Sequence, residues 1–315
     1  MVSGDAGMGK TTTLQYLAYE DALRCQNDAE QNMPFYLALK SLATGKMTLR
    51  SKISDELARF PLDFVETRLQ NGKITLFLDG LNELGDQVGS LESQIQDLID
   101  RYPEVPLLLS SRTSHRFDIS KTERMPVFGM IKMAPDHIKT FLSKNSSTSA
   151  SEVIRAEMDR DEDFLDWLRV PMLLKMIIEV VAERQKNPEY DDPIPENTHE
   201  LMASFIDKLY QREGDRDSRF KKITFDELTT HLATRLFEKK GSNTAITVNE
   251  TIRILIERIE KGFPNADLDY FLRVSTEIGI LMAHKNAYSF ANERYLDYYR
   301  AKGMPDNEED EFDFD

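Results

Sequence analysis

Between Pro34 and Ile131 the chain alternates short apolar runs with longer segments whose apolar residues recur at helical spacing. The apolar runs predict buried strands at residues 34–39, 74–79, 106–112 and 126–131. The intervening segments predict helices at residues 49–59, 62–70 and 87–102. Strands that alternate with helices are typical of a parallel sheet flanked by helices, so we expect an α/β fold for this part of the chain.

After Met133 the pattern becomes helical. Capping boxes, in which Glu follows a Ser or Thr by three residues, predict helix starts at Ser149, Thr224 and Thr247. Near the end, apolar runs at 278–282 and 288–290 flank three polar residues and predict a small hairpin. Helices followed by such a hairpin indicate a winged helix. We therefore expect an α/β domain at 1–133, an all-α helical domain at 134–213, a winged-helix domain at 214–303 and a disordered acidic tail at 304–315.

The first residues carry a motif around which the rest can be interpreted, Gly4-Asp5-Ala6-Gly7-Met8-Gly9-Lys10-Thr11-Thr12. The spacing of its outer glycines, with Lys-Thr directly after, is that of a phosphate-binding P-loop. Glycine lets backbone N–H groups turn inward around a phosphate, and the predicted following helix adds its positive N-terminal end. In such a loop Lys10 reaches the β- and γ-phosphates, and the Thr11 hydroxyl ligates Mg²⁺.

A P-loop normally follows a buried strand, yet only Met1 and Val2 precede Ser3-Gly4. A clipped first strand is one explanation. We favour the other, that the sequence begins inside a longer protein.

Charged residues at the ends of two predicted strands fit the same chemistry. Asp79 ends an apolar strand, so its carboxylate is expected at the carboxyl edge of the sheet, where it can hold Mg²⁺ opposite Thr11. Glu83, four residues on, can orient or activate an attacking water. Arg112 ends the neighbouring strand, from which a guanidinium can contact a γ-phosphate. Without the P-loop, Asp79 would be interpreted as a turn cap; for Arg112 a surface ion pair is an equal alternative.

Composition narrows the class of protein further. The net charge is −15, from 40 Lys and Arg against 55 Asp and Glu, and acidic residues fill most of 306–315. This balance disfavours sequence-independent binding to nucleic acid. The single cysteine excludes a disulfide framework, and no apolar run or leader pattern indicates a membrane span or export, so we expect a cytoplasmic protein. Phe312 and Phe314 among the acids can dock on a basic partner, but a solubilising tail is the favoured interpretation.

Taken in order, these motifs resemble the NACHT family of STAND-class P-loop NTPases over roughly residues 1–302. The matching stretches are Gly4–Thr12, Pro34–Leu39, Leu78–Leu84, Leu107–Arg112, Leu168–Leu174 and Ser289–Ala301. A small residue after the strand-end Asp, with an acidic residue three further on, separates NACHT modules from most other P-loop ATPases. Gly80 and Glu83 match that pattern.

The resemblance implies a molecular switch that binds ATP or ADP with Mg²⁺. Its closed, ADP-bound state folds the winged helix over the nucleotide, and exchange to ATP opens it and drives homo-oligomerisation. The resemblance also implies an N-terminal effector and a C-terminal sensor that this sequence lacks, and a trigger ligand that it does not identify. Similar bacterial proteins act in defence against phage, and animal members are innate immune receptors.

Family positions add two residues to the site. Pro171, which also suits the first position of a helix, would line the base pocket, and Asn292 stands where a His usually contacts the β-phosphate. Asn82 replaces a second acidic residue common in the family, and we expect this change to weaken hydrolysis while leaving binding intact. Thr113 stands where many members have proline.

Two other functions fit parts of the pattern. A motor or loader ATPase of the wider AAA-like kind would turn over continuously on a partner and take an arginine finger from a neighbouring subunit. A non-catalytic module would use nucleotide to hold its domains together, and its winged helix would bind DNA, which the acidic balance disfavours.

Overall fold

The computed structural model describes residues 1–304 apart from residues 29, 43–46, 83–87, 113–124, 188–189, 215–218, 263–265 and 285. The chain divides into two compact units. The first unit contains residues 1–130, 236–251 and 283–290, and the second contains the remainder. Among the described helices, none is long and apolar enough to cross a membrane.

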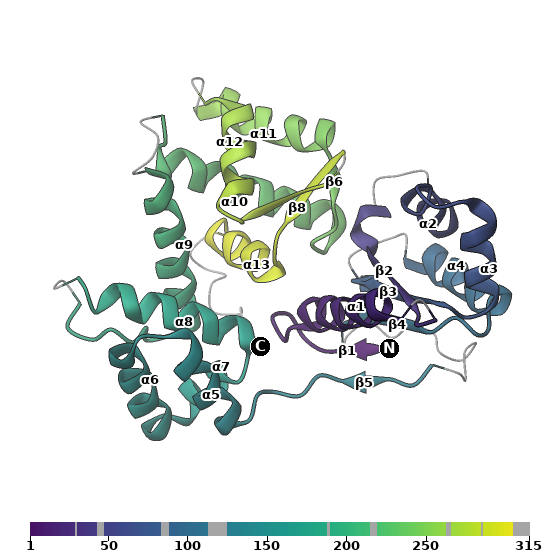
Figure 1. The fold of residues 1–315 in the computed structure, drawn as a ribbon. Helices are drawn as coiled ribbons and strands as arrows, with labels where there is room; N and C mark the ends of the chain where they lie inside the picture. The colour runs from purple at the N-terminus through teal and green to yellow at the C-terminus, as the bar shows by residue number, and fades with distance from the viewer. Residues whose placement is uncertain are drawn as a thin grey trace. The chain divides into compact units, whose positions relative to one another are not determined.

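The main sheet of the first unit has five parallel strands in the order β2-β3-β4-β1-β5 (Figure 1). They are β1 (Val2–Ser3), β2 (Met33–Ala38), β3 (Ile74–Asp79), β4 (Leu107–Ser111) and β5 (Phe128–Gly129). Every residue of β3 is buried, as its unbroken apolar run predicts for a strand of a covered parallel sheet. The α/β architecture expected from the alternating pattern is confirmed.

The fifth strand is shorter than predicted. The apolar run at 126–131 indicated about six residues of strand, but β5 contains only Phe128 and Gly129. The reason lies in its partner. Among the described residues β5 pairs with β1, which consists of Val2 and Ser3. A strand cannot extend its ladder beyond the strand that it pairs with.

Helices cover both faces of the sheet, and β3 contributes alternate residues to each (Figure 1). On one face, Leu14 and Ala18 of α1 (Lys10–Asn27) pack against Phe77. On the other face, Leu76 and Leu78 belong to a larger core. That core includes residues of α2 (Leu49–Glu56), α3 (Leu62–Gln70) and α4 (Val88–Arg101). This packing fixes α1 directly after the loop at the carboxyl end of β1.

A second, small sheet has the order β6-β8-β7, with β6 (Ile246–Thr247) antiparallel to β8 (Ala287–Phe290) and β7 formed by Leu281–His284. Strand β8 confirms the second run of the predicted hairpin, whereas the first strand begins at Leu281 and not at Ile278. Lys285 of this hairpin lies outside the described residues. Within the first unit, Asn243 exchanges two hydrogen bonds of 3.0 Å with the backbone of Phe290. The Lys40 ammonium, on the 3₁₀ turn Leu39–Leu42, donates to the same carbonyl at 3.2 Å and is buried.

The described part of the second unit is mostly helical. Its helices, two of which begin or end in the first unit, are α5 (Pro135–Asn145), α6 (Thr148–Arg160), α7 (Glu162–Leu168), α8 (Pro171–Arg184), α9 (Thr198–Gly214), α10 (Lys222–Lys240), α11 (Val248–Gly262), α12 (Leu268–Glu277) and α13 (Glu293–Lys302). The hydroxyls of Tyr210 and Tyr299 meet at 2.8 Å and join α9 to α13. Burial raises the pKa of both phenols, so the pair stays neutral and hydrogen-bonded.

Two of the three predicted helix starts are displaced. Ser147 rather than Ser149 caps α6, accepting a hydrogen bond from the Ala150 N–H at 3.3 Å. Several adjacent Ser and Thr residues compete there for the same role, and only the backbone conformation selects one. Similarly, α10 begins at Lys222, two residues before Thr224. The third start is confirmed, because Thr247 accepts from the Glu250 N–H at 3.2 Å.

Gly72 and Gly241 form a matched pair for testing a close contact between the turn after α3 and the segment before β4. Both follow a helix with φ +64°, but a Cβ on Gly72 would lie 2.4 Å from the Glu104 carbonyl oxygen, whereas one on Gly241 would meet nothing within 4 Å. Gly241→Ala should lower the free energy of unfolding by about 1–2 kcal/mol, because the added Cβ is strained in the left-handed backbone conformation but meets no neighbour. Gly72→Ala should lose about 3 kcal/mol or more. Urea unfolding measures both, and equal losses would contradict the close contact.

Candidate functional site

The loop between β1 and α1 lies at the carboxyl edge of the main sheet and carries the glycine-rich motif. Gly7 and Gly9 have φ of 80° and 90°, where a side chain is strained, so the turn depends on glycine at these points. At Gly4 the constraint is space, because a Cβ would lie 2.8 Å from the Met130 Cβ. The loop then leads directly into α1, whose first N–H groups and positive dipole end face the loop.

The Lys10 ammonium folds back over this loop. Its Nζ donates to the carbonyl oxygens of Gly4 at 2.5 Å and Asp5 at 2.8 Å. A cation is therefore held against the glycine-rich loop. A positive charge beside a loop of this type is suited to a phosphate group.

The Asp79 carboxylate, at the carboxyl end of β3, is buried beside the start of α1. Its Oδ2 accepts hydrogen bonds from the Thr11 hydroxyl at 2.7 Å and from the Tyr36 hydroxyl at 2.9 Å. Its Oδ1 accepts from the Ser110 hydroxyl. Three hydroxyls, from α1, β2 and β4, thus hold one carboxylate in a single orientation. We call Thr11, Tyr36, Asp79 and Ser110 the hydroxyl–carboxylate cluster.

Ser110 links the carboxylate to the turn that follows it. Its oxygen accepts a hydrogen bond from the Gly80 N–H at 2.8 Å while its proton is donated to Asp79. Gly80 has φ 83°, which lets the chain leave β3 sharply without a side-chain penalty. The position of Asp79 is therefore fixed from both sides of the strand end.

The donor set fits Mg²⁺. Magnesium prefers hard oxygen ligands and is usually held by one or two protein groups together with substrate phosphates and water. A hydroxyl carries one proton and two lone pairs, so Thr11 can donate to Asp79 and still offer oxygen to a cation. Among the described residues, no group of three His, Cys, Asp or Glu side chains is arranged to hold a metal.

The remaining predicted site residues lie in different parts of the chain, and one of them lies outside the described residues. Arg112 follows β4 directly, two residues after Ser110 at the same sheet edge, and is partly buried. Glu83, the predicted water-orienting residue, lies outside the described residues. Pro171 and Asn292 belong to the second unit. Pro171 is the first residue of α8, and the Asn292 side chain caps α13 by accepting from the Arg294 N–H at 2.9 Å.

Residues 1–149 match the model of the NACHT domain family. This part of the chain is a NACHT domain. The match contains the glycine-rich loop, the hydroxyl–carboxylate cluster and Arg112, and it supports a nucleotide-binding P-loop NTPase. A comparison with curated proteins finds no match.

Several solved structures resemble this chain distantly. The Aeropyrum pernix ORC2 protein is 12% identical with a TM-score of 0.41, over 95% of this chain and 86% of that one. A variant of Thermotoga maritima RuvB is 14% identical with a TM-score of 0.35, over 92% and 83%. The Drosophila ORC bound to DNA is 12% identical with a TM-score of 0.34, over 96% and 89%. Likenesses this distant carry no inference about function.

Tyr36 and Ser110 are the site residues that the sequence analysis missed. Both carried a signal, since each is a hydroxyl residue in or next to an apolar strand run that neighbours β3. Strand register completes the inference, because Leu78 pairs with Leu109 and so places Ser110 level with Asp79. Register was not available from the pattern of apolar residues alone.

Removing the Tyr36 hydroxyl should weaken metal-dependent nucleotide binding by misorienting Asp79. A hydrogen bond to a charged group contributes about 1.5–3 kcal/mol, so Tyr36→Phe should raise the Mg²⁺ concentration for half-maximal binding about tenfold or more. A titration of Mg²⁺ against a fluorescent ATP analogue measures this. Tyr19→Phe, on an exposed phenol of α1, is the matched control. Identical Mg²⁺ curves for the two variants would exclude Tyr36 from positioning Asp79.

Proposed function

We propose that this chain is the nucleotide-switch part of a STAND-type protein that binds ATP, hydrolyses it slowly and holds ADP in its closed state. The observation that carries the proposal is the hydroxyl–carboxylate cluster beside the glycine-rich loop of a NACHT domain. A phosphate cradle and an oriented carboxylate, joined by Thr11, are the two parts that P-loop nucleotide chemistry requires.

In this proposal the site residues divide the tasks of phosphate binding, metal binding and catalysis. The phosphates are surrounded by the backbone N–H groups of residues 4–12, which are Gly4, Asp5, Ala6, Gly7, Met8, Gly9, Lys10, Thr11 and Thr12. The Lys10 ammonium leaves the loop carbonyls and neutralises phosphate charge. Thr11 and Asp79 hold Mg²⁺, which supplies charge neutralisation between the phosphates when bound. Glu83 orients the attacking water, and Arg112 contacts the γ-phosphate and reports its presence.

The switching part of the proposal concerns the rest of the chain. Helices α10 to α12 with the small sheet β6-β8-β7 fit the order expected for a winged helix. In the closed state Pro171 would contact the base, and the Asn292 amide, whose oxygen caps α13, would donate an N–H to the β-phosphate. Exchange of ADP for ATP would favour an open state that assembles into a homo-oligomer, in signalling of the defence type. A two-state equilibrium biased by one phosphate is sufficient for this.

The nucleotide that accompanies the purified protein distinguishes a switch from a motor. Protein purified without added nucleotide and then denatured should release about one ADP per chain, since a closed switch retains its product. Lys10→Ala should reduce this at least tenfold, whereas Lys73→Ala, which removes a cation at the opposite edge of the sheet, should not. Chromatography of the released nucleotide measures both. An empty site with rapid ATP turnover would favour a motor or loader ATPase and remove the switch.

Glu83→Gln should separate binding from hydrolysis. The amide keeps the size of the carboxylate but cannot accept a proton, so ATP binding should persist while turnover falls by about 100-fold or more. Single-turnover hydrolysis of labelled ATP gives the rate, and equilibrium binding gives the control. Asn82→Gln, which changes the preceding amide without altering charge, should leave turnover nearly unchanged. If Glu83→Gln hydrolyses ATP at the parental rate, Glu83 has no part in the mechanism.

A further inference from the structure

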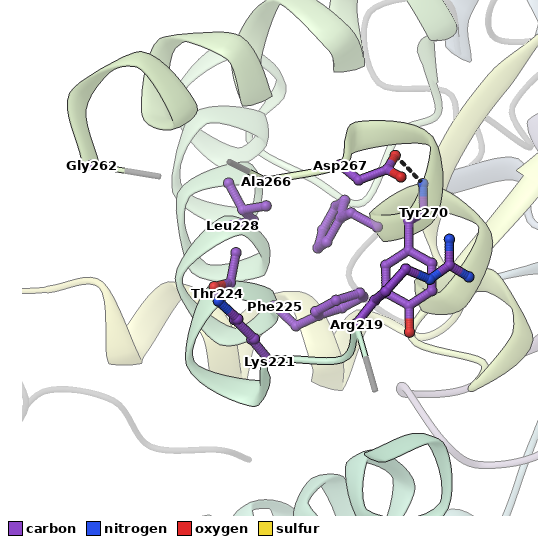
Figure 2. A pocket seen from close by; sticks show the side chains of 10 residues that line it. Arg219, Lys221, Thr224, Phe225, Leu228, Gly262, Ala266, Asp267 and Tyr270 are labelled. Atoms are coloured by element: carbon purple, nitrogen blue, oxygen red, sulfur yellow. Dashed lines mark hydrogen bonds between the residues drawn. The ribbon is translucent and has the colours of Figure 1, made fainter. Parts of the chain in front are cut away.

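A cavity of about 420 Å³ opens in the second unit between α10 and α12 (Figure 2). Its inner surface includes Phe225, Leu228 and Phe271, all buried. Phe225 and Phe271 lie with ring centroids 5.2 Å apart, and both belong to a larger aromatic cluster. The volume lies within the range of about 300–1,000 Å³ that pockets for small molecules occupy, and its apolar wall suits an aromatic ring.

The mouth of this cavity is cationic. Arg219 and Lys221 line it and are exposed, and the Arg219 guanidinium lies 4.4 Å from the centre of the Tyr270 ring (Figure 2). Among the described residues that line the cavity, one is acidic, Asp267. Its carboxylate accepts a hydrogen bond from the Tyr270 N–H at 2.9 Å. The cavity therefore combines an aromatic interior with an excess of positive charge at its rim.

The C-terminal helix α13 ends against α10, the helix that lines the cavity. Lys302, at the end of α13, pairs with Asp226 of α10. Gly303 is packed so closely on α10 that a Cβ would lie 2.7 Å from the Thr234 hydroxyl and 3.0 Å from the Thr230 methyl. Asp226 is the residue after Phe225, so α13 ends against the same helix that lines the cavity.

We propose that the acidic segment at the end of this chain docks on this cavity, with Phe312 or Phe314 in the aromatic interior and the neighbouring carboxylates at Arg219 and Lys221. The segment reads Asp306-Asn307-Glu308-Glu309-Asp310-Glu311-Phe312-Asp313-Phe314-Asp315. It is an acidic run that ends in an alternation of acidic and aromatic residues, and so offers both the charge and the rings that the cavity suits. The proposal concerns a contact within one chain and does not depend on the nucleotide site.

Reach does not limit this contact. Phe312 lies nine residues after Gly303, and an extended chain spans about 3.3 Å per residue, so the aromatic side chain can travel about 30 Å. A helix is only about 10–12 Å in diameter, so the segment can pass round α10 to the cavity mouth. A short tether also holds the segment at an effective concentration in the millimolar range, so a weak contact is sufficient for occupancy.

A photo-crosslink in the full chain tests the proposal. With p-azidophenylalanine in place of Phe312, and separately of Phe314, illumination should yield an adduct within one chain that maps by mass spectrometry to residues 219–228 or 266–271. The pair Arg219→Glu and Lys221→Glu should reduce that adduct at least fivefold, and so should 0.5 M salt, because the rim contact is electrostatic. Both substitutions are on exposed side chains, and circular dichroism checks the fold.

Lys186→Glu is the matched control, since it reverses an exposed charge of the same unit away from the lining residues. It should leave the adduct unchanged, and the same photoreactive group at Asn307 should not give the cavity adduct. The proposal is overturned if illumination gives no cavity adduct, or adducts at other surfaces. It is equally overturned if the cavity adduct joins two chains or survives the charge reversal at full yield.

Discussion

The need to satisfy one buried carboxylate governs the architecture of the candidate nucleotide site. An ionised carboxylate out of water is costly unless donors surround it, and Asp79 is buried at the end of the most enclosed strand of the sheet. Its hydrogen-bond donors come from three different elements, α1, β2 and β4. The same bonds that lower the cost of burial therefore tie the start of α1 to the sheet edge. A change in any one of these elements alters the orientation of the carboxylate.

This arrangement also explains why the glycine-rich loop is closely confined. Its entry is pressed against Met130 and its exit is α1, which is held by Thr11 on Asp79 and by Leu14 on Phe77. Between these fixed ends, the left-handed turns at Gly7 and Gly9 leave the backbone few alternatives. The glycine-rich loop is thus organised by contacts that lie outside it, so the core supplies the pre-organisation that the proposed phosphate binding requires.

The sequence predicts those residues of the site whose roles depend on neighbours along the chain. It does not predict those whose roles depend on residues far away in the sequence. Glycine spacing and the apolar run that ends at Asp79 are local patterns, and they place the loop, α1 and the carboxylate correctly. Tyr36 and Ser110 act through strand order and register, which a single sequence does not contain, although both are unusual polar residues next to apolar runs. The displaced start of α6 shows the same limit on a smaller scale, since neighbouring Ser and Thr residues offer equal local caps.

Context also changes the meaning of the acidic segment. Considered by itself, a run of carboxylates indicates a solvated tail, because charge repulsion opposes compaction and little apolar area is available to bury. Its two phenylalanines have no role in that interpretation. A cavity with an aromatic interior and a cationic rim, lined by the helix on which α13 ends, supplies a site for both features at once. Repulsion within the segment then favours docking, because bringing the carboxylates to Arg219 and Lys221 relieves part of it.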